Sequence, residues 1–147
     1  IAGGWFPQAG GVDANGIASW NGTAWSPLGL SLNNVVEELV VYNGDLHAAG
    51  RFNSINANPG ANLFHVARWT GTAWMPLNAG LDSWCHTLAV SNSRLYAGGL
   101  FTAAGSQLAS RVAAGPDPGQ CPGDVNGASP VDVDDLISVI LNWGACP

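Results

Sequence analysis

The chain has 147 residues, of which 10 are acidic and 4 basic, and every basic residue is an arginine. The formal net charge of −6 argues against a protein that binds nucleic acid or another polyanion. No run of about 18 apolar residues occurs, so no membrane-spanning helix is expected. Only 10% of the residues are charged while 47% are hydrophobic, a balance that favours an extracellular protein kept soluble by uncharged polar groups.

Short motifs recur along the first three quarters of the chain. The motif Ala-Gly-Gly-Trp-Phe at residues 2–6 returns in altered form at 48–52 and 97–101. A longer motif at residues 17–28 returns 49 residues later, at 66–77. Recurrence at a nearly fixed spacing indicates a repeat protein. The 20 glycines and 9 prolines are interleaved with Trp, Val and Leu, which predicts many turns between short strands.

Each repeat is predicted to contain four strands. In the complete copy, one strand ends at Tyr42, a second spans residues 46–52, a third ends at Trp69, and a fourth spans residues 73–77. The chain opens at the second strand of one repeat and passes the third strand of another near Ala114. Ten strands, or about two and a half units, are therefore expected.

Two dipeptides predict tight hairpins between these strands. Asn21-Gly22 and Asn43-Gly44 suit two-residue turns, because both central positions of such a turn take positive φ. The strands should therefore be antiparallel. The Ala-Gly-Gly step leaves no side chain where strands or sheets come close, and the paired tryptophans of each repeat are expected to fill space between stacked sheets.

These motifs resemble kelch-like β-propeller repeats, and more closely the Tyr-Ala-Gly-Gly-x-Phe and Trp-Asn-Gly-Thr-x-Trp repeats of large secreted bacterial proteins. The resemblance covers about residues 1–114 and implies a mainly β fold of antiparallel, four-stranded propeller-type blades, incomplete at both ends. Closed propellers have about four to eight blades. We therefore expect either further repeats upstream or several copies that complete one another as a ring or an extracellular fibril.

A second module follows the repeats. Residues 115–120 are a linker rich in Pro and Gly, and residues 121–147 are expected to fold separately. Residues 115–147 carry five acids and no base. Cys121 and Cys146 bracket the module in matching Cys-Pro dipeptides, which predicts a disulfide and an oxidising, extracellular location.

Within this module, twelve residues from Asp124 place oxygen ligands at positions 1, 3, 9 and 12 of a calcium loop, before a stretch with helical spacing. The module resembles half of a dockerin, which implies calcium and a cohesin-like partner. Ser129 before Pro130 departs from the usual loop, and cohesin-binding dockerins carry two loops. The alternative is that Asp132 caps the helix with no metal bound. The candidate ligands are Asp124, Asn126, Asp132 and Asp135.

Four single residues have open interpretations. Trp5 and Trp84 break the repeat pattern, so they are candidates for surface contact with a partner or a glycan. Asn21 begins an N-glycosylation tripeptide that also suits a hairpin turn. Cys85 is expected to be a buried thiol, with intermolecular pairing as the alternative.

No catalytic signature is present in the sequence. His47, His65 and His86 are predicted on different strands, and Glu37 and Glu38 should point to opposite faces of one strand, which makes a poor acid–base pair. We therefore expect a secreted, non-catalytic structural or interaction protein that associates with itself or with other repeat chains and is anchored by a dockerin-like tail. One alternative is a lectin-like, carbohydrate-binding propeller, and a weaker one is an enzyme whose site lies in upstream repeats.

Overall fold

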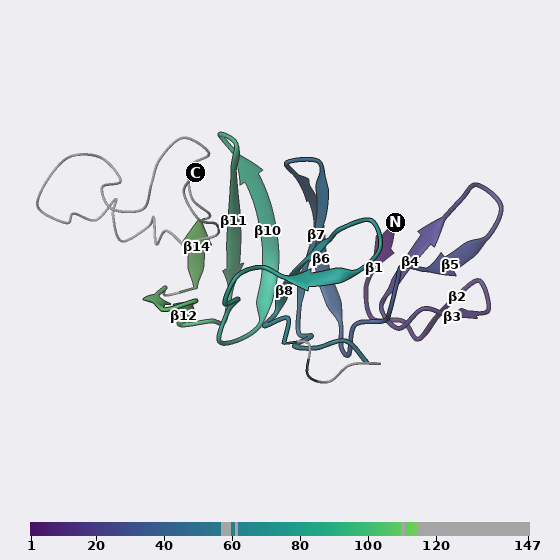
Figure 1. Cartoon of the computed structure of the whole chain (residues 1–147), viewed down its shortest axis with the longest axis horizontal. Coiled ribbons are helices and arrows are strands. Elements are labelled where there is room, and N and C mark those ends of the chain that lie inside the picture. The colour runs from purple at the N-terminus through teal and green to yellow at the C-terminus, as the bar shows by residue number, and fades with distance from the viewer. Residues whose placement is uncertain (57–59, 61, 110, 115–147) are drawn as a thin grey trace, which may run out of the picture.

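The computed structural model describes residues 1–56, 60, 62–109 and 111–114, and the account of the fold is confined to them (Figure 1). In this part of the chain every strand pairing is antiparallel, and no helix occurs. The expected mainly β class with antiparallel sheets is confirmed. None of these residues belongs to a helix that is long and apolar enough to cross a membrane.

The middle sheet is a complete four-stranded unit. Its strands are β6 (Val36–Tyr42), β7 (Asp45–Gly50), β8 (Val66–Trp69) and β9 (Trp74–Pro76), hydrogen-bonded in that order. This is the four-strand arrangement predicted from the complete copy of the repeat.

A three-stranded sheet lies on each side of the middle one (Figure 1). The first has the order β1-β4-β5 and lacks a counterpart of β6, whereas the third has the order β10-β11-β14 and lacks a counterpart of β9 in the described part of the chain. The ten predicted strands are thus present. The bounds are β1 (Ala2–Gly3), β4 (Ile17–Trp20), β5 (Trp25–Pro27), β10 (Cys85–Ser91), β11 (Arg94–Gly99) and β14 (Val112–Ala114).

Two short hairpins were not predicted. One pairs β2 (Gln8–Ala9) with β3 (Val12–Asp13), and the other pairs β12 (Ala103–Ala104) with β13 (Gln107–Leu108). Each lies in the connection between the second and third strands of its repeat. Two-residue strands are too short to show an alternating pattern in the sequence.

The hairpin prediction is confirmed at one dipeptide. Asn43 and Gly44, between β6 and β7, have φ values of 51° and 84°. The same turn recurs between β10 and β11, where Asn92 and Ser93 have φ values of 48° and 58°. The repeat therefore preserves the turn even where serine replaces glycine.

At Asn21-Gly22 the predicted antiparallel hairpin is present, but the predicted two-residue turn, with positive φ at both residues, is wrong. The loop between β4 and β5 spans residues 21–24, and only Gly22 in it has positive φ. The Asn21 side-chain Oδ1 accepts hydrogen bonds from the backbone N–H groups of Thr23 (2.9 Å) and Ala24 (2.8 Å). Asparagine thus closes the turn with its side chain, so it does not need to adopt positive φ itself.

The last glycine of the Ala-Gly-Gly motif lies where two backbone segments come close, as predicted. An added Cβ would lie 2.1 Å from the Val35 carbonyl oxygen at Gly50, and 2.1 Å from the Trp84 carbonyl oxygen at Gly99. Such contacts are far inside van der Waals distance, so only glycine fits at the end of the second strand.

The middle sheet contributes to two cores, one on each face. Neighbouring residues of a strand point to opposite faces. Ala48 accordingly belongs to a core shared with the first repeat, which includes Ile17, while Ala49 belongs to a core shared with the third repeat, which includes Leu95. The three sheets are therefore stacked face to face in chain order.

One backbone connection recurs in all three repeats and fixes their alignment. The residue before the third strand has positive φ in each case: 85° at Gly16, 69° at His65 and 71° at Arg111. The carbonyl oxygen of each accepts a hydrogen bond from the backbone N–H of the glycine at the end of the second-strand motif. These bonds join Gly4 N to Gly16 O (2.9 Å), Gly50 N to His65 O (3.1 Å) and Gly99 N to Arg111 O (2.9 Å). His65 therefore precedes a strand and does not lie in one.

Candidate functional site

No described residue covers the outward face of the third sheet, which we call the downstream face. With the repeats aligned as above, Ile17, Val66 and Val112 are equivalent first residues of the third strand. Ile17 and Val66 are fully buried (0% exposed) against the next sheet, whereas Val112 is 43% exposed. Leu100, on the same side of its repeat as Arg51, is 48% exposed. The downstream face is defined by Leu100 and Val112.

The opposite end of the stack, the upstream face, is likewise left open by the residues that the structure describes. Trp69 packs against the core between the first and second repeats, and its neighbour Trp74 is only 2% exposed. Trp74 donates its indole N–H to the Leu28 carbonyl oxygen of the first repeat (3.1 Å). Trp20, the equivalent of Trp69, is 48% exposed, and we define the upstream face by Trp20 and by Trp25, which packs against it. The prediction that paired tryptophans fill space between sheets thus holds where a preceding repeat is present.

The two end sheets also have strand edges without a pairing partner among the described residues. In the described part of the chain, β1 and β14 each pair on one side only. Their other sides leave backbone N–H and C=O groups without a ladder partner. The complete unit shows which strands would occupy these positions, namely counterparts of β6 and β9.

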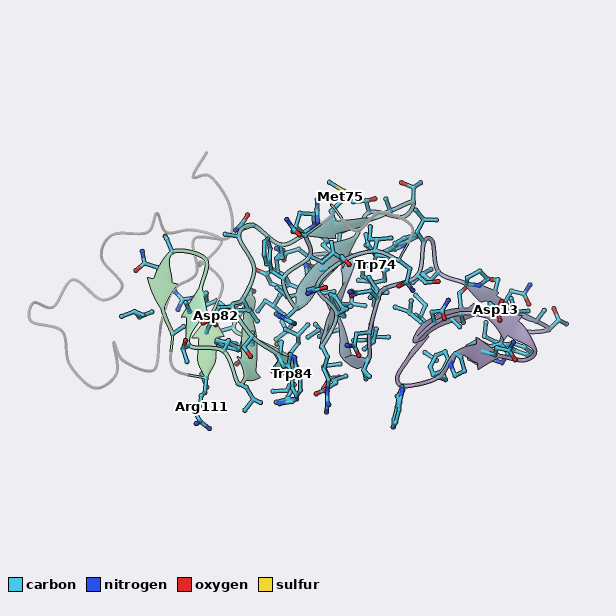
Figure 2. The ribbon with its side chains drawn as sticks, turned by 90° about the horizontal axis from the view of Figure 1, so that it is seen from below. Asp13, Trp74, Met75, Asp82, Trp84 and Arg111 are labelled. Atoms are coloured by element: carbon cyan, nitrogen blue, oxygen red, sulfur yellow. The ribbon has the colours of Figure 1, made fainter. Side chains whose placement is uncertain are left out.

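A polar cluster that the sequence did not predict joins the second and third repeats. Glu37 Oε1 lies 2.5 Å from Arg51 Nε, and Glu37 Oε2 is hydrogen-bonded to His86 Nδ1. The Arg51 guanidinium lies over the Trp84 ring, 4.5 Å from its centroid. Figure 2 shows Trp84 at the lower margin of the stack, toward the green third repeat.

The alignment of the repeats in the sequence contains the signal from which this cluster could have been predicted. Glu37 and His86 occupy the same repeat position, 49 residues apart, so stacking brings them to adjacent strands. A β-bulge between Val36 and Glu38 also changes the simple alternation expected for Glu37 and Glu38.

The electrostatics of Glu37 favour its charged form. Burial acts to raise the pKa of this carboxyl, but hydrogen bonds and charge from His86 and Arg51 outweigh burial and hold the pKa below its usual value. A carboxylate held between an arginine and a histidine of different repeats is suited to linking them.

The two predicted surface tryptophans differ in their environment. Trp5 is 91% exposed and lies beside a groove of about 330 Å³ between the first and second repeats. Trp84 is 40% exposed and is covered by Arg51. Both therefore reach the surface, and the Trp5 ring is the more exposed of the two.

The remaining predicted residues have structural roles where they are described. The amide of Asn21 closes the β4–β5 loop, which favours the turn interpretation. Cys85 is fully buried at the start of β10, with Sγ 3.4 Å from the Thr87 carbonyl oxygen. The expectation of a buried thiol is therefore confirmed, and burial raises the pKa of this thiol to about 12.

His47 is also enclosed. It is 3% exposed, its Nδ1 lies 3.2 Å from the Asp45 carbonyl oxygen, and burial lowers its pKa. Asp45 in turn binds Arg68 (2.9 Å). A neutral imidazole held in this way acts as a packing residue of β7.

The tail predictions fall on residues that the structure does not describe. These residues are Cys121, Cys146 and the candidate calcium ligands Asp124, Asn126, Asp132 and Asp135. Within residues 1–114, apart from the few left undescribed, no group of three or more His, Cys, Asp or Glu side chains could hold a metal ion. Comparisons with protein-family models, curated proteins and solved structures found no match to this chain.

Proposed function

We propose that this is a secreted, non-catalytic structural or interaction protein that assembles through its repeats, as a ring or an extracellular fibre, with the C-terminal module as an anchor. The observation that supports the proposal best is the contrast between Val66 and Val112. The two valines are equivalent, yet Val66, which packs against the third repeat, is buried, whereas Val112 is 43% exposed.

The energetics favour covering the two end faces. Fully burying a valine or leucine side chain contributes about 1.5–3 kcal/mol. Among the described residues of the two end faces, Trp20 is 48% exposed, Leu100 48% and Val112 43%.

The partner that best fits the downstream face is the upstream face of a second copy of the chain. The middle repeat demonstrates that one such sheet accepts another on both faces. Only 10% of residues are charged, so repulsion between copies is weak. A contact between unlike faces forms a ring if its rotation closes, and a filament if it does not.

The C-terminal module completes the proposal. A calcium-stabilised half-dockerin clasped by Cys121 and Cys146 would carry most of the negative charge of the chain away from the stacked sheets. It would thereby display an anchoring element on each copy without adding charge to the interface.

A substitution in the downstream face tests assembly. We expect the wild-type chain to form multimers at micromolar concentration, seen by light scattering and electron microscopy, and Val112→Asp to shift it to monomers. Val41→Asp is the matched control, because Val41 is 65% exposed on the middle sheet, whose two faces are both covered. A dispersed wild-type monomer whose β1 and β14 amides exchange rapidly with solvent would refute the proposal.

A further inference from the structure

The two junctions between repeats are built alike but filled differently. Trp5 and Arg51 are equivalent residues after the second strand, and Val35 and Trp84 are equivalent residues before the first strand. The backbone confirms the second equivalence, since Val35 O accepts from Arg51 N (3.0 Å) and Trp84 O accepts from Leu100 N (2.8 Å). Each junction therefore brings together one residue of each kind: Trp5 with Val35, and Arg51 with Trp84.

At the second junction the chain fills the space with its own side chains. Arg51 lies 4.5 Å from the Trp84 ring centroid and 2.5 Å from Glu37. A cation over an indole face, tied to a carboxylate, holds both side chains in place.

At the first junction the corresponding space is open. Val35 is too short to reach an indole partner in the way that Trp84 reaches Arg51, and Trp5 is 91% exposed. The result is a groove of about 330 Å³. Its lining contains no ionisable side chain and includes Trp5, Phe6, Asn15, Asn33, Asn34 and Asn56.

The asparagines of this groove are held by hydrogen bonds to the protein. Asn33 Oδ1 accepts from the backbone N–H groups of Asn53 (2.9 Å) and Ser54 (3.1 Å). Asn56 Nδ2 donates to the Leu32 carbonyl oxygen (3.1 Å). An amide side chain has two donors and two acceptor lone pairs. Asn33 also donates from Nδ2 to Asn53 Oδ1 (2.7 Å), so one N–H of Asn33 remains for a ligand, whereas Asn56 commits only one N–H to the described residues.

We propose that this groove binds a neutral saccharide, with the Trp5 indole stacked on a sugar ring and the asparagine amides hydrogen-bonded to its hydroxyls. This inference is independent of the proposed assembly, because both sides of the groove belong to one chain. Hydroxyl groups donate and accept at once, as amides do, and a pyranose offers an apolar face to an aromatic ring. An uncharged lining gives no counter-charge to an anionic glycan.

A proline-rich peptide is a poorer fit to the same groove. Its backbone at proline positions offers carbonyl acceptors but no N–H donors. Among the described residues Asn56 Oδ1 has no donor, so it would remain without a partner, which costs free energy in a desolvated site.

The test uses an array of neutral oligosaccharides (gluco-, manno-, galacto- and N-acetylglucosamine oligomers), with polygalacturonate, a sulfated glycan and a proline-rich decapeptide beside them. We expect the full chain to bind at least one neutral oligosaccharide with a change in tryptophan fluorescence. Trp5→Ala should weaken that binding by about tenfold or more, since truncating an aromatic anchor removes much of the binding energy. Trp84→Ala, the matched control at the filled junction, should bind as the wild type does.

A second variant closes the groove without removing its asparagines. The double substitution Trp5→Arg with Val35→Trp places the arginine–tryptophan pair of the second junction at the first, and should abolish binding while the circular dichroism spectrum is unchanged. Val112→Asp should bind sugar normally, which separates this inference from assembly. Binding only to the anionic glycans or the peptide, no binding to any neutral oligosaccharide, or full binding by Trp5→Ala would overturn it.

Discussion

Asn33 and Asp82 lie 49 residues apart and hold the same backbone connection with different side chains. Each precedes the first strand of its repeat, and each uses one side-chain oxygen to accept two consecutive backbone N–H groups. The donors to Asn33 are Asn53 and Ser54, and the donors to Asp82 are Thr102 (2.8 Å) and Ala103 (2.9 Å). A single oxygen at this position thus ties the start of one repeat to the loop after its second strand.

The first prediction concerns this oxygen. Asp82→Asn should change the free energy of unfolding by less than about 1 kcal/mol, because Asn33 makes the equivalent bonds and the Thr102 hydroxyl can rotate to accept from the new amide. Asp82→Ala should destabilise by about 1–3 kcal/mol, since the two backbone N–H groups lose their acceptor. Urea unfolding measures both, and equal effects would contradict the prediction.

The second prediction separates two adjacent glycines. A Cβ at Gly99 would meet the Trp84 carbonyl oxygen at 2.1 Å, whereas a Cβ at Gly98 would meet the Thr87 methyl group at 2.9 Å. Gly99→Ala should therefore destabilise by about 2 kcal/mol or more, because backbone must move. Gly98→Ala should cost clearly less, since the middle repeat carries Ala49 at that position. Thermal unfolding of the two variants decides the order.

The third prediction is a loss of stability in acid that depends on Glu37. Because the pKa of this carboxyl is lowered in the folded protein, its stabilisation is complete above the unfolded-state pKa of about 4.3 and is lost as pH falls through the folded-state pKa. Glu37→Gln should flatten the fall of melting temperature below about pH 5. The neighbouring Glu38→Gln is the control, and an identical flattening there would contradict the assignment to Glu37.

The fourth prediction concerns the three cysteines. Cys85 should resist a thiol reagent in the native protein, because burial raises its pKa to about 12 and the thiolate is the reactive form. Cys121 and Cys146 should react only after reduction, since we expect them to be bonded. Closing a loop of about 25 residues should stabilise the tail by roughly 3–4 kcal/mol. Peptide mapping without reductant that finds both as free thiols would refute the clasp.

The fifth prediction concerns calcium. If the loop from Asp124 to Asp135 holds the ion, ligand oxygens should lie about 2.3–2.6 Å from it. Chelation should then lower the melting temperature of the tail and leave that of the repeats unchanged. Asp124→Asn with Asp135→Asn should abolish the heat of calcium binding in calorimetry. A tail whose stability is indifferent to chelation would favour the alternative, in which Asp132 only caps a helix.

The strands and turns of the repeats could be predicted because each depends on the conformational preferences of a few consecutive residues. Asn43-Gly44 specifies a turn by its own backbone preferences, and Gly50 specifies a close approach by the absence of a side chain. The contact between Glu37 and His86 was not predictable from either residue, because it depends on how two sheets stack. The error at Asn21 has a similar cause: whether asparagine uses its backbone or its side chain to close a turn depends on the length of the loop.

The division of Ala48 and Ala49 between two cores has a consequence for how such a chain can change over evolutionary time or by engineering. Since the middle repeat presents compatible surfaces before and after itself, duplication or deletion of a whole 49-residue segment alters the length of the stack while each remaining junction keeps its packing. An insertion of part of a repeat would instead expose a core. The gene can therefore lengthen or shorten in whole modules, and copy number becomes the variable that sets the size of the array.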